Sequence, residues 1–346
     1  LIDLIKIETV KPYKALDHFF DLQKNGWLGS DVAHSIQLND KKVLWLFGDT
    51  FVGEREQNCR GENWVFLNNT IGIMELKNNT PCDMKFYWGL NNSKPDSFFL
   101  TRKEIPGDFL WPTNGIVIND SLVIFCMAVN KTADQTIDIA GTVCIRVDNY
   151  LEEPNNWLFE IWDFKFNEGI PHAAFFKDDY YIYNFLTNRN YFNDGMYLGR
   201  NKKVFFSAKN DSKQMEFFNG DSWGKKFSNA KECFYPSCSE SNIYFDKKTK
   251  LFFTTTYRPQ DNEMLLTWAE RITGPWKKPI KIFEIPESNK QFSVHSYAMR
   301  IHGWLSDKTK KLIISYATNE FGGMDNLMTP EGMDIYRPKF VEVKLK

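Results

Sequence analysis

The sequence predicts an all-β fold and, within that class, a five-bladed β-propeller. A strand–turn–strand pattern recurs five times, and aromatic residues, which are enriched in strands, make up 16% of the chain. The first strands of the repeats align at His34, Thr113, His172, Glu240 and His295. Irregular repeats of this size, built from short strands, favour propeller blades.

The clearest repeat is the segment Gly29–Phe51, which reads GSDVAHSIQLNDKKVLWLFGDTF. The strand-forming runs Val32–Leu38 and Val43–Phe47 flank a turn at Asn39–Lys42, which predicts a hairpin. In a hairpin centred on that turn Asp31 faces Asp49, with Cβ atoms about 5 Å apart. The alternatives are a register shifted by one residue, or two acids that only cap turns.

The outer strands of each blade follow from further apolar alternation. Third strands are expected at Thr70–Leu76, Thr142–Val147, Leu265–Arg271 and Phe340–Leu345. In the third repeat, Met196–Phe206 and Met215–Phe218 are the candidate outer strands. Fourth strands are expected at Asp83–Trp88, Leu158–Lys165 and Pro279–Ile285. The last repeat lacks one, so we expect the N-terminal Ile2–Thr9 to pair with it and close the ring.

Residues 1–346 contain no linker or low-complexity tract, which predicts a single propeller domain. A short helix is expected near Lys14–Leu22. The competing architecture is a two-sheet sandwich with a long insertion.

The bulk composition argues against several functional classes. The net charge of −1 predicts neither nucleic-acid binding nor attachment to a membrane surface, and no apolar run is long enough for a membrane span. The six cysteines are far apart, which speaks against a metal or redox motif. The chain begins at Leu1 without a signal peptide, so we expect a trimmed form of a secreted, periplasmic or cell-surface protein.

Carboxylates carry the predicted chemistry. Opposed like charges destabilise a hairpin, so the pairing of Asp31 with Asp49 suggests function, and paired carboxylates are what glycosidic-bond hydrolysis needs. Glu240, flanked by serines in a predicted buried strand, is either a structural hydrogen-bonding group or a third catalytic carboxyl. Glu320 is a rival acid, expected on a solvated loop.

Sugar binding is expected from polar and aromatic residues at the ends of the inner strands. His34, His172 and His295 occupy the same aligned position, and they predict either a polar ring that binds a sugar or hydrogen bonds within the channel wall. The other predicted substrate-binding residues are Trp111, Asn114, Tyr257, Arg258 and Asn319, with Tyr316 as a further aromatic candidate. No cofactor is expected, although a central channel has room for a structural cation such as Ca²⁺.

The segment Gly29–Gly53, GSDVAHSIQL…KKVLWLFGDTFVG, resembles a family of five-bladed propellers that includes endo-D-arabinanases. The resemblance is fainter over Glu270–Pro286 and Tyr336–Leu345. It implies that Asp31 and Asp49 are the catalytic carboxylates. The wider arabinanase and fructosidase propellers spread their acids over three blades, whereas two acids fall in the first repeat here.

The sequence therefore predicts a glycoside hydrolase that acts on a furanoside polysaccharide such as arabinan, or on its oligosaccharides. The alternative is a propeller that binds glycans without cleaving them, or a scaffold that uses its rim loops.

Overall fold

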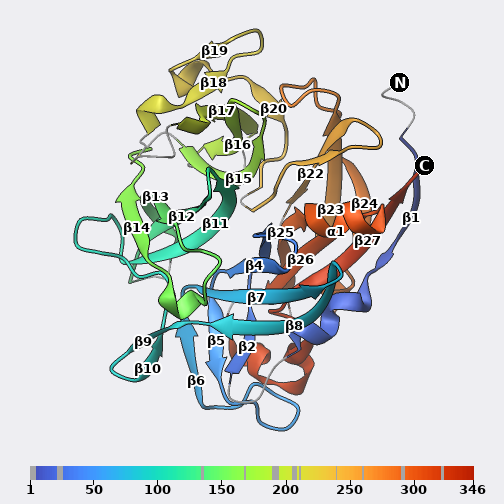
Figure 1. Ribbon diagram of the computed structural model, residues 1–346. Helices are drawn as coiled ribbons and strands as arrows, with labels where there is room; N and C mark the ends of the chain where they lie inside the picture. Colours follow the sequence, from blue (N-terminus) through green and yellow to red (C-terminus); the bar gives the residue numbers. More distant parts are fainter. Residues whose placement is uncertain are drawn as a thin grey trace. The chain divides into compact units, whose positions relative to one another are not determined.

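The computed structural model (Figure 1) describes residues 5–21, 26–133, 136–166, 169–188, 195–204, 209, 212–238, 240–258, 261–289, 293–320 and 323–346, with the backbone alone for 169–175. These residues confirm the all-β class. They form seven sheets, more than the two of the sandwich alternative. The chain divides into two compact units, one of Leu1–Phe99, Tyr257–Leu265 and Lys281–Lys346, the other of Leu100–Thr256 and Leu266–Ile280.

In the first unit, the N-terminal strand joins the last repeat. The sheet order is β1 (Ile7–Pro12), β27 (Lys339–Leu345), β26 (Leu312–Glu320) and β25 (Val294–Ile301). Ile7 pairs with Leu345 and Pro12 with Val341. The predicted pairing is confirmed, although the strand lies later in the chain than Ile2–Thr9, and residues 1–4 are outside the described residues.

The first repeat forms the sheet β3 (His34–Gln37), β4 (Lys42–Phe47), β7 (Thr70–Lys77) and β8 (Thr80–Tyr87). His34 pairs with Leu46 and Gln37 with Val43, which is the predicted register without a slip. A second sheet, β2 (Gly26–Ser30), β5 (Thr50–Gly53) and β6 (Trp64–Leu67), extends the same hairpin. The ribbon β9 (Gly89–Asn91) and β10 (Lys94–Asp96) follows.

The core beneath these sheets is aromatic. Trp27, Trp45, Phe47 and Phe20 are fully buried and belong to one cluster. Phe20 comes from η2 (Lys14–Phe20), a 3₁₀ helix where the sequence predicted a short helix. The remaining helices described in this unit are α1 (Gly303–Thr309), η8 (Pro286–Asn289), η9 (Asp325–Met328) and η10 (Pro330–Asp334).

The second unit contains the second and third repeats. One sheet is β11 (Phe109–Ile118), β12 (Ser121–Asn130), β13 (Asp138–Val147) and β14 (Phe159–Asp163). The other is β15 (Gly169–Lys177), β16 (Tyr181–Asn188), β17 (Met196–Lys202), β18 (Glu216–Phe218) and β19 (Trp223–Gly224), with β20 (Glu232–Phe234) also on β17. Short 3₁₀ turns are η3 (Pro154–Asn156), η6 (Ser212–Gln214) and η7 (Phe227–Asn229).

The fourth repeat has the sheet order β21 (Tyr244–Asp246), β22 (Leu251–Arg258), β23 (Glu263–Ala269) and β24 (Ile280–Glu284). The predicted first strand, 239–243, was placed too early, because β21 begins only at Tyr244. The residues before it are mostly short polar side chains, which compete with the ladder for backbone hydrogen bonds.

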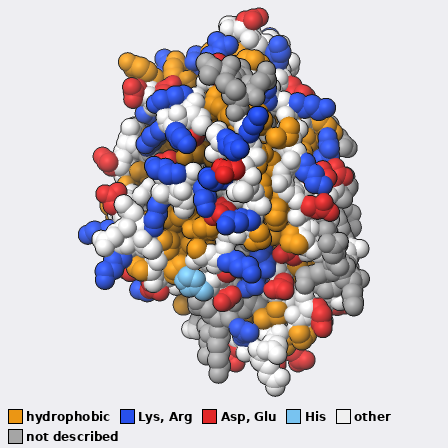
Figure 2. Space-filling model, turned by 90° about the vertical axis from the view of Figure 1, so that its right-hand side faces the viewer, with side chains coloured by type: hydrophobic (Ala, Val, Ile, Leu, Met, Phe, Trp, Pro, Cys, Tyr) orange, Lys and Arg blue, Asp and Glu red, His pale blue; other side chains and the backbone are white. Residues whose placement is uncertain are grey.

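No helix among the described residues is long and apolar enough to cross a membrane. On the face shown in Figure 2, basic and acidic side chains are interspersed, in keeping with the balanced net charge.

Candidate functional site

Asp31 and Asp49 lie opposite each other where the first hairpin passes from the sheet of β3 and β4 to the sheet of β2 and β5. Asp31 follows β2 and Asp49 precedes β5. The Asp31 amide donates to the Asp49 carbonyl at 3.1 Å, and the Gly48 amide donates to the Asp31 carbonyl at 3.4 Å. The predicted opposition of the two acids is therefore present in the structure.

A neutral donor holds each carboxylate. The Tyr297 hydroxyl donates to Asp31 Oδ2 at 3.1 Å, and the Asn68 side-chain amide donates to Asp49 Oδ1 at 3.2 Å. Both aspartates are half-buried. A neutral donor orients a carboxylate and leaves its charge in place, which suits a group that must accept or release a proton.

Gly48 makes room for the Asp31 carboxylate. A Cβ atom at position 48 would lie 2.4 Å from Asp31 Oδ1, closer than atoms pack. Any side chain there would displace the carboxylate, so the glycine beside Asp49 is a steric part of the site.

Tyr336 lies within electrostatic reach of both aspartates. The side chain is buried, and its pKa is raised well above the ordinary value, first by burial and then by the negative charges of Asp31 and Asp49. The phenol stays protonated at neutral pH and so remains a donor. The backbone has φ of 60°, and its amide is fixed by the Thr318 carbonyl at 2.9 Å.

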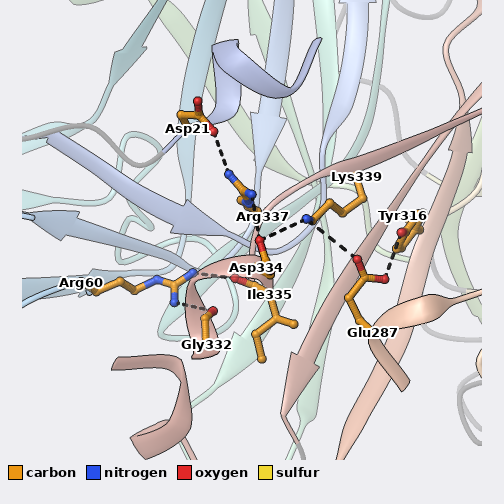
Figure 3. A network of polar contacts seen from close by, with 9 residues as sticks. All are labelled: Asp21, Arg60, Glu287, Tyr316, Gly332, Asp334, Ile335, Arg337 and Lys339. Carbon is orange, nitrogen blue, oxygen red and sulfur yellow. Dashed lines mark hydrogen bonds and ion pairs between the residues drawn. The ribbon is translucent and has the colours of Figure 1, made fainter. Parts of the chain in front are cut away.

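Arg60 fixes the segment that leads to Tyr336. The guanidinium is fully buried and donates to the carbonyls of Leu28 (2.9 Å), Gly332 (3.0 Å), Ile335 (2.6 Å) and Leu327. Figure 3 shows it reaching Gly332 and Ile335. Desolvation lowers its pKa to about 10, so it stays charged at neutral pH.

Ion pairs hold the same segment at Asp334 (Figure 3). Asp334 contacts Arg337 at 3.2 Å and Lys339 at 3.7 Å, and Arg337 also pairs with Asp21 at 2.8 Å. Tyr316, an aromatic candidate for sugar binding, belongs to this network instead. It is buried and donates its hydroxyl to Glu287 at 3.0 Å, which leaves no ring face for a sugar.

His295 and Asn319 come together with the aspartates. They are directly paired on β25 and β26, and the His295 ring stacks on Tyr297 at 5.3 Å. Burial lowers the pKa of His295 to about 4, so the imidazole is neutral at pH 7. Tyr297 thus links His295 to Asp31.

His34 and His295 have different surroundings. His34 pairs with Leu46 across β3 and β4, whereas His295 pairs with Asn319 ahead of the register shift between Tyr297 and Arg300. Their alignment stays a prediction. His34 is buried, and its Nδ1 accepts from the Arg300 guanidinium.

Glu320 is not on a solvated loop as expected. It ends β26 and is half-buried, with Oε1 accepting from the Asn326 amide. Its Oε2 is buried without a hydrogen-bond partner among the described residues. It is a further carboxyl in the same unit as Asp31 and Asp49.

The remaining predicted residues are placed as follows. Tyr257 is buried in the first unit, and the exposed Arg258 pairs with Asp261 at 3.5 Å. Glu240, Trp111 and Asn114 belong to the second unit, and Glu240 is buried before β21 rather than in a strand. Asn114 accepts from the Gly115 amide at 2.8 Å, and Trp111 contacts Phe109 at 5.3 Å. The His172 side chain is outside the described residues. Their functional roles stay predictions.

Sequence reasoning missed Tyr297, Asn68, Tyr336, Arg60 and Gly48. Tyr297 had a local signal, because it is two residues after His295 and so on the same face of the strand. The contacts of Asn68, Tyr336 and Arg60 join distant parts of the chain, which no local pattern reveals.

No group of three or more His, Cys, Asp or Glu side chains that could hold a metal ion occurs among the residues described.

The fold and the site define an all-β protein with a pair of opposed carboxylates, each of which accepts a hydrogen bond from an uncharged side chain. The chain belongs to the family described as a domain of unknown function, DUF5005, whose profile matches residues 13–345. No curated protein matches it.

Two of the similar solved structures illustrate the shared fold. A candidate hydrolase from Bacteroides ovatus is 20% identical with a TM-score of 0.78, over 96% of this chain and 90% of that one. The α-L-arabinofuranosidase of Podospora anserina, solved in complex with cellotriose, is 11% identical with a TM-score of 0.52, over 94% of each chain.

Proposed function

We propose that this protein is a glycoside hydrolase that cleaves a furanoside polysaccharide of the arabinan type and that Asp31 and Asp49 are its catalytic pair. The observation that supports this most is the opposition of the two carboxylates across one hairpin, each held by a neutral donor. A hairpin gains no stability from facing like charges, so their placement suggests chemistry.

The reaction needs one protonated and one ionised carboxyl. The protonated member gives its proton to the glycosidic oxygen as the bond to the anomeric carbon breaks. The ionised member either attacks the anomeric carbon or takes a proton from the attacking water. Tyr297 and Asn68 orient the pair, and Tyr336 adds a protonated phenol nearby. Glu240 is the proposed third carboxyl.

Two observations support the proposed substrate class. The similar structures include an arabinofuranosidase and a candidate hydrolase, and the segment Gly29–Gly53 resembles arabinanase propellers. His295 and Asn319, next to Tyr297, are the proposed sugar-binding residues. His34, Trp111, Asn114, His172, Tyr257 and Arg258 keep their predicted binding roles as part of this proposal.

We also propose that residues 1–346 form one five-bladed propeller domain. Five of the seven sheets have four or more strands, each containing one sequence repeat, and β1 pairs with β27 as ring closure requires. A polymeric substrate suits a secreted, periplasmic or cell-surface protein.

The test is release of reducing sugar from a panel of arabinans and xylans. We expect release from arabinan, and Asp31→Asn and Asp49→Asn should each lower turnover by about 10³-fold or more without unfolding the protein. Glu75→Gln is the matched control, a half-buried carboxyl in the same unit with no proposed role, and should keep most of the activity.

Near-normal turnover in both Asn variants would show that the pair is structural. If the wild type cleaves nothing on the panel yet binds arabinan, the protein is a glycan-binding propeller instead.

A further inference from the structure

A cavity of about 660 Å³ lies within the second compact unit, and none of the predicted site residues lines it. Its walls come from two stretches of the chain, 218–233 around β18 to β20 and 271–276 after β23. Its volume is within the range of small-molecule sites, enough for a short oligosaccharide.

Trp223 is a fixed aromatic wall of this cavity. The Arg200 guanidinium lies 4.1 Å from the centre of the Trp223 ring and 4.0 Å from the centre of the Tyr181 ring. Arg200 Nε also pairs with Glu216 Oε2 at 2.9 Å. The indole is therefore held in place before any ligand arrives, which lowers the entropy cost of stacking on it.

Charged groups of both signs surround the aromatic wall. Asp221, Lys231, Glu232 and Arg271 all line the cavity and are exposed, and the Thr273 hydroxyl joins them. Two acidic and two basic side chains give a lining without net charge, which disfavours a polyanion. They offer many hydrogen-bond donors and acceptors beside an apolar ring face.

We infer that this cavity is a second, non-catalytic site for a neutral oligosaccharide. Such a ligand has apolar C–H faces that stack on an aromatic ring and hydroxyl groups that match donors and acceptors at its edge. The inference rests on the proposed function for its ligand class, because it adds a second glycan contact on the same chain.

The experiment is calorimetric titration of arabinotriose and xylotriose into the Asp31→Asn/Asp49→Asn double variant, which cannot consume them. We expect two sites per chain. Adding Trp223→Ala should remove one site or weaken it about tenfold, the size of one lost aromatic contact. Glu232→Gln, a change on an exposed side chain, should weaken the same site.

Tyr180→Ala is the control, an exposed aromatic residue in the same unit that does not line the cavity, and should change neither affinity nor stoichiometry. A single site that Trp223→Ala leaves intact, or two sites unaffected by both Trp223→Ala and Glu232→Gln at unchanged melting temperature, overturns the inference.

The two proposals fail separately. A wild type that cleaves no arabinan but shows binding dependent on Trp223 refutes the hydrolase and supports the second site. A wild type that cleaves arabinan, with binding that does not depend on Trp223, supports the hydrolase and refutes the second site.

Discussion

Tyr297 connects the predicted sugar-binding histidine to the predicted acid. Its ring stacks on His295 and its hydroxyl donates to Asp31. The Tyr297 hydroxyl therefore helps to orient Asp31, while Gly48 leaves the space that this carboxylate occupies.

We expect Tyr297→Phe to lower kcat about tenfold, because it deletes one hydrogen bond to a reacting group and keeps the stacked ring. The measurement is kcat and KM on arabinan together with the melting temperature. Tyr316→Phe is the matched control, since it removes the hydroxyl of another tyrosine that bonds a carboxylate, Glu287. Equal losses of turnover in the two variants would contradict a positioning role for Tyr297.

The segment from η9 to Tyr336 consists mainly of two short 3₁₀ helices and takes its position from contacts at both ends. Arg60 binds three of its carbonyls, and the Arg337 and Lys339 ion pairs hold Asp334. Tyr336 reaches the aspartates because this element is fixed.

Arg60→Lys should destabilise the protein by about 3 kcal/mol or more, because an ammonium group cannot serve four carbonyls and leaves some buried without a donor. Turnover should fall as Tyr336 loses its fixed position. Denaturant unfolding and kcat are the measurements. Arg102→Lys, on an exposed arginine that lies over the Phe159 ring, is the control and should change neither. Wild-type stability in Arg60→Lys would refute this account of the segment.

Strand β1 covers the edge of β27. Deleting residues 1–12 should lower the melting temperature by more than about 5 °C and promote aggregation, because it exposes an unpaired strand edge. Calorimetry and light scattering measure the two effects. Deleting only residues 1–5, which precede β1, is the control. A truncated protein that melts like the full chain would show that this pairing contributes little.

At the scale of the whole molecule, stability depends on histidines that are buried in the neutral form. Burial lowers the pKa of His302 to about 3, and the nearby Arg300 charge acts in the same direction. His302 Nδ1 lies 2.7 Å from the Ser35 hydroxyl, and its ring contacts Trp45 and Phe340.

The unfolded chain binds protons at these histidines below pH 6.5, whereas the folded chain does so only near pH 3 to 4. The unfolding free energy should therefore fall as the pH drops from 6.5 towards 4, by up to about 1.4 kcal/mol per pH unit for each histidine. His302→Asn should reduce this slope. Denaturant unfolding at several pH values measures it, and an unchanged slope in His302→Asn would contradict the assignment.

The sequence by itself determined the all-β class, the strands of most repeats and the register that opposes Asp31 to Asp49. These follow from local alternation and turn chemistry, which act over a few residues. It misplaced the first strand of the fourth repeat, since a polar segment leaves no clear period.

Only the tertiary structure decided what surrounds the acids. Asn68, Tyr297, Arg60 and Tyr336 meet through hydrogen bonds, packing and electrostatic fields between residues far apart in the chain. Burial sets the pKa of His295 and Arg60, and burial is a property of the packed chain. Which side chain holds a carboxylate therefore depends on long-range contacts, which exist only once the strands have come together.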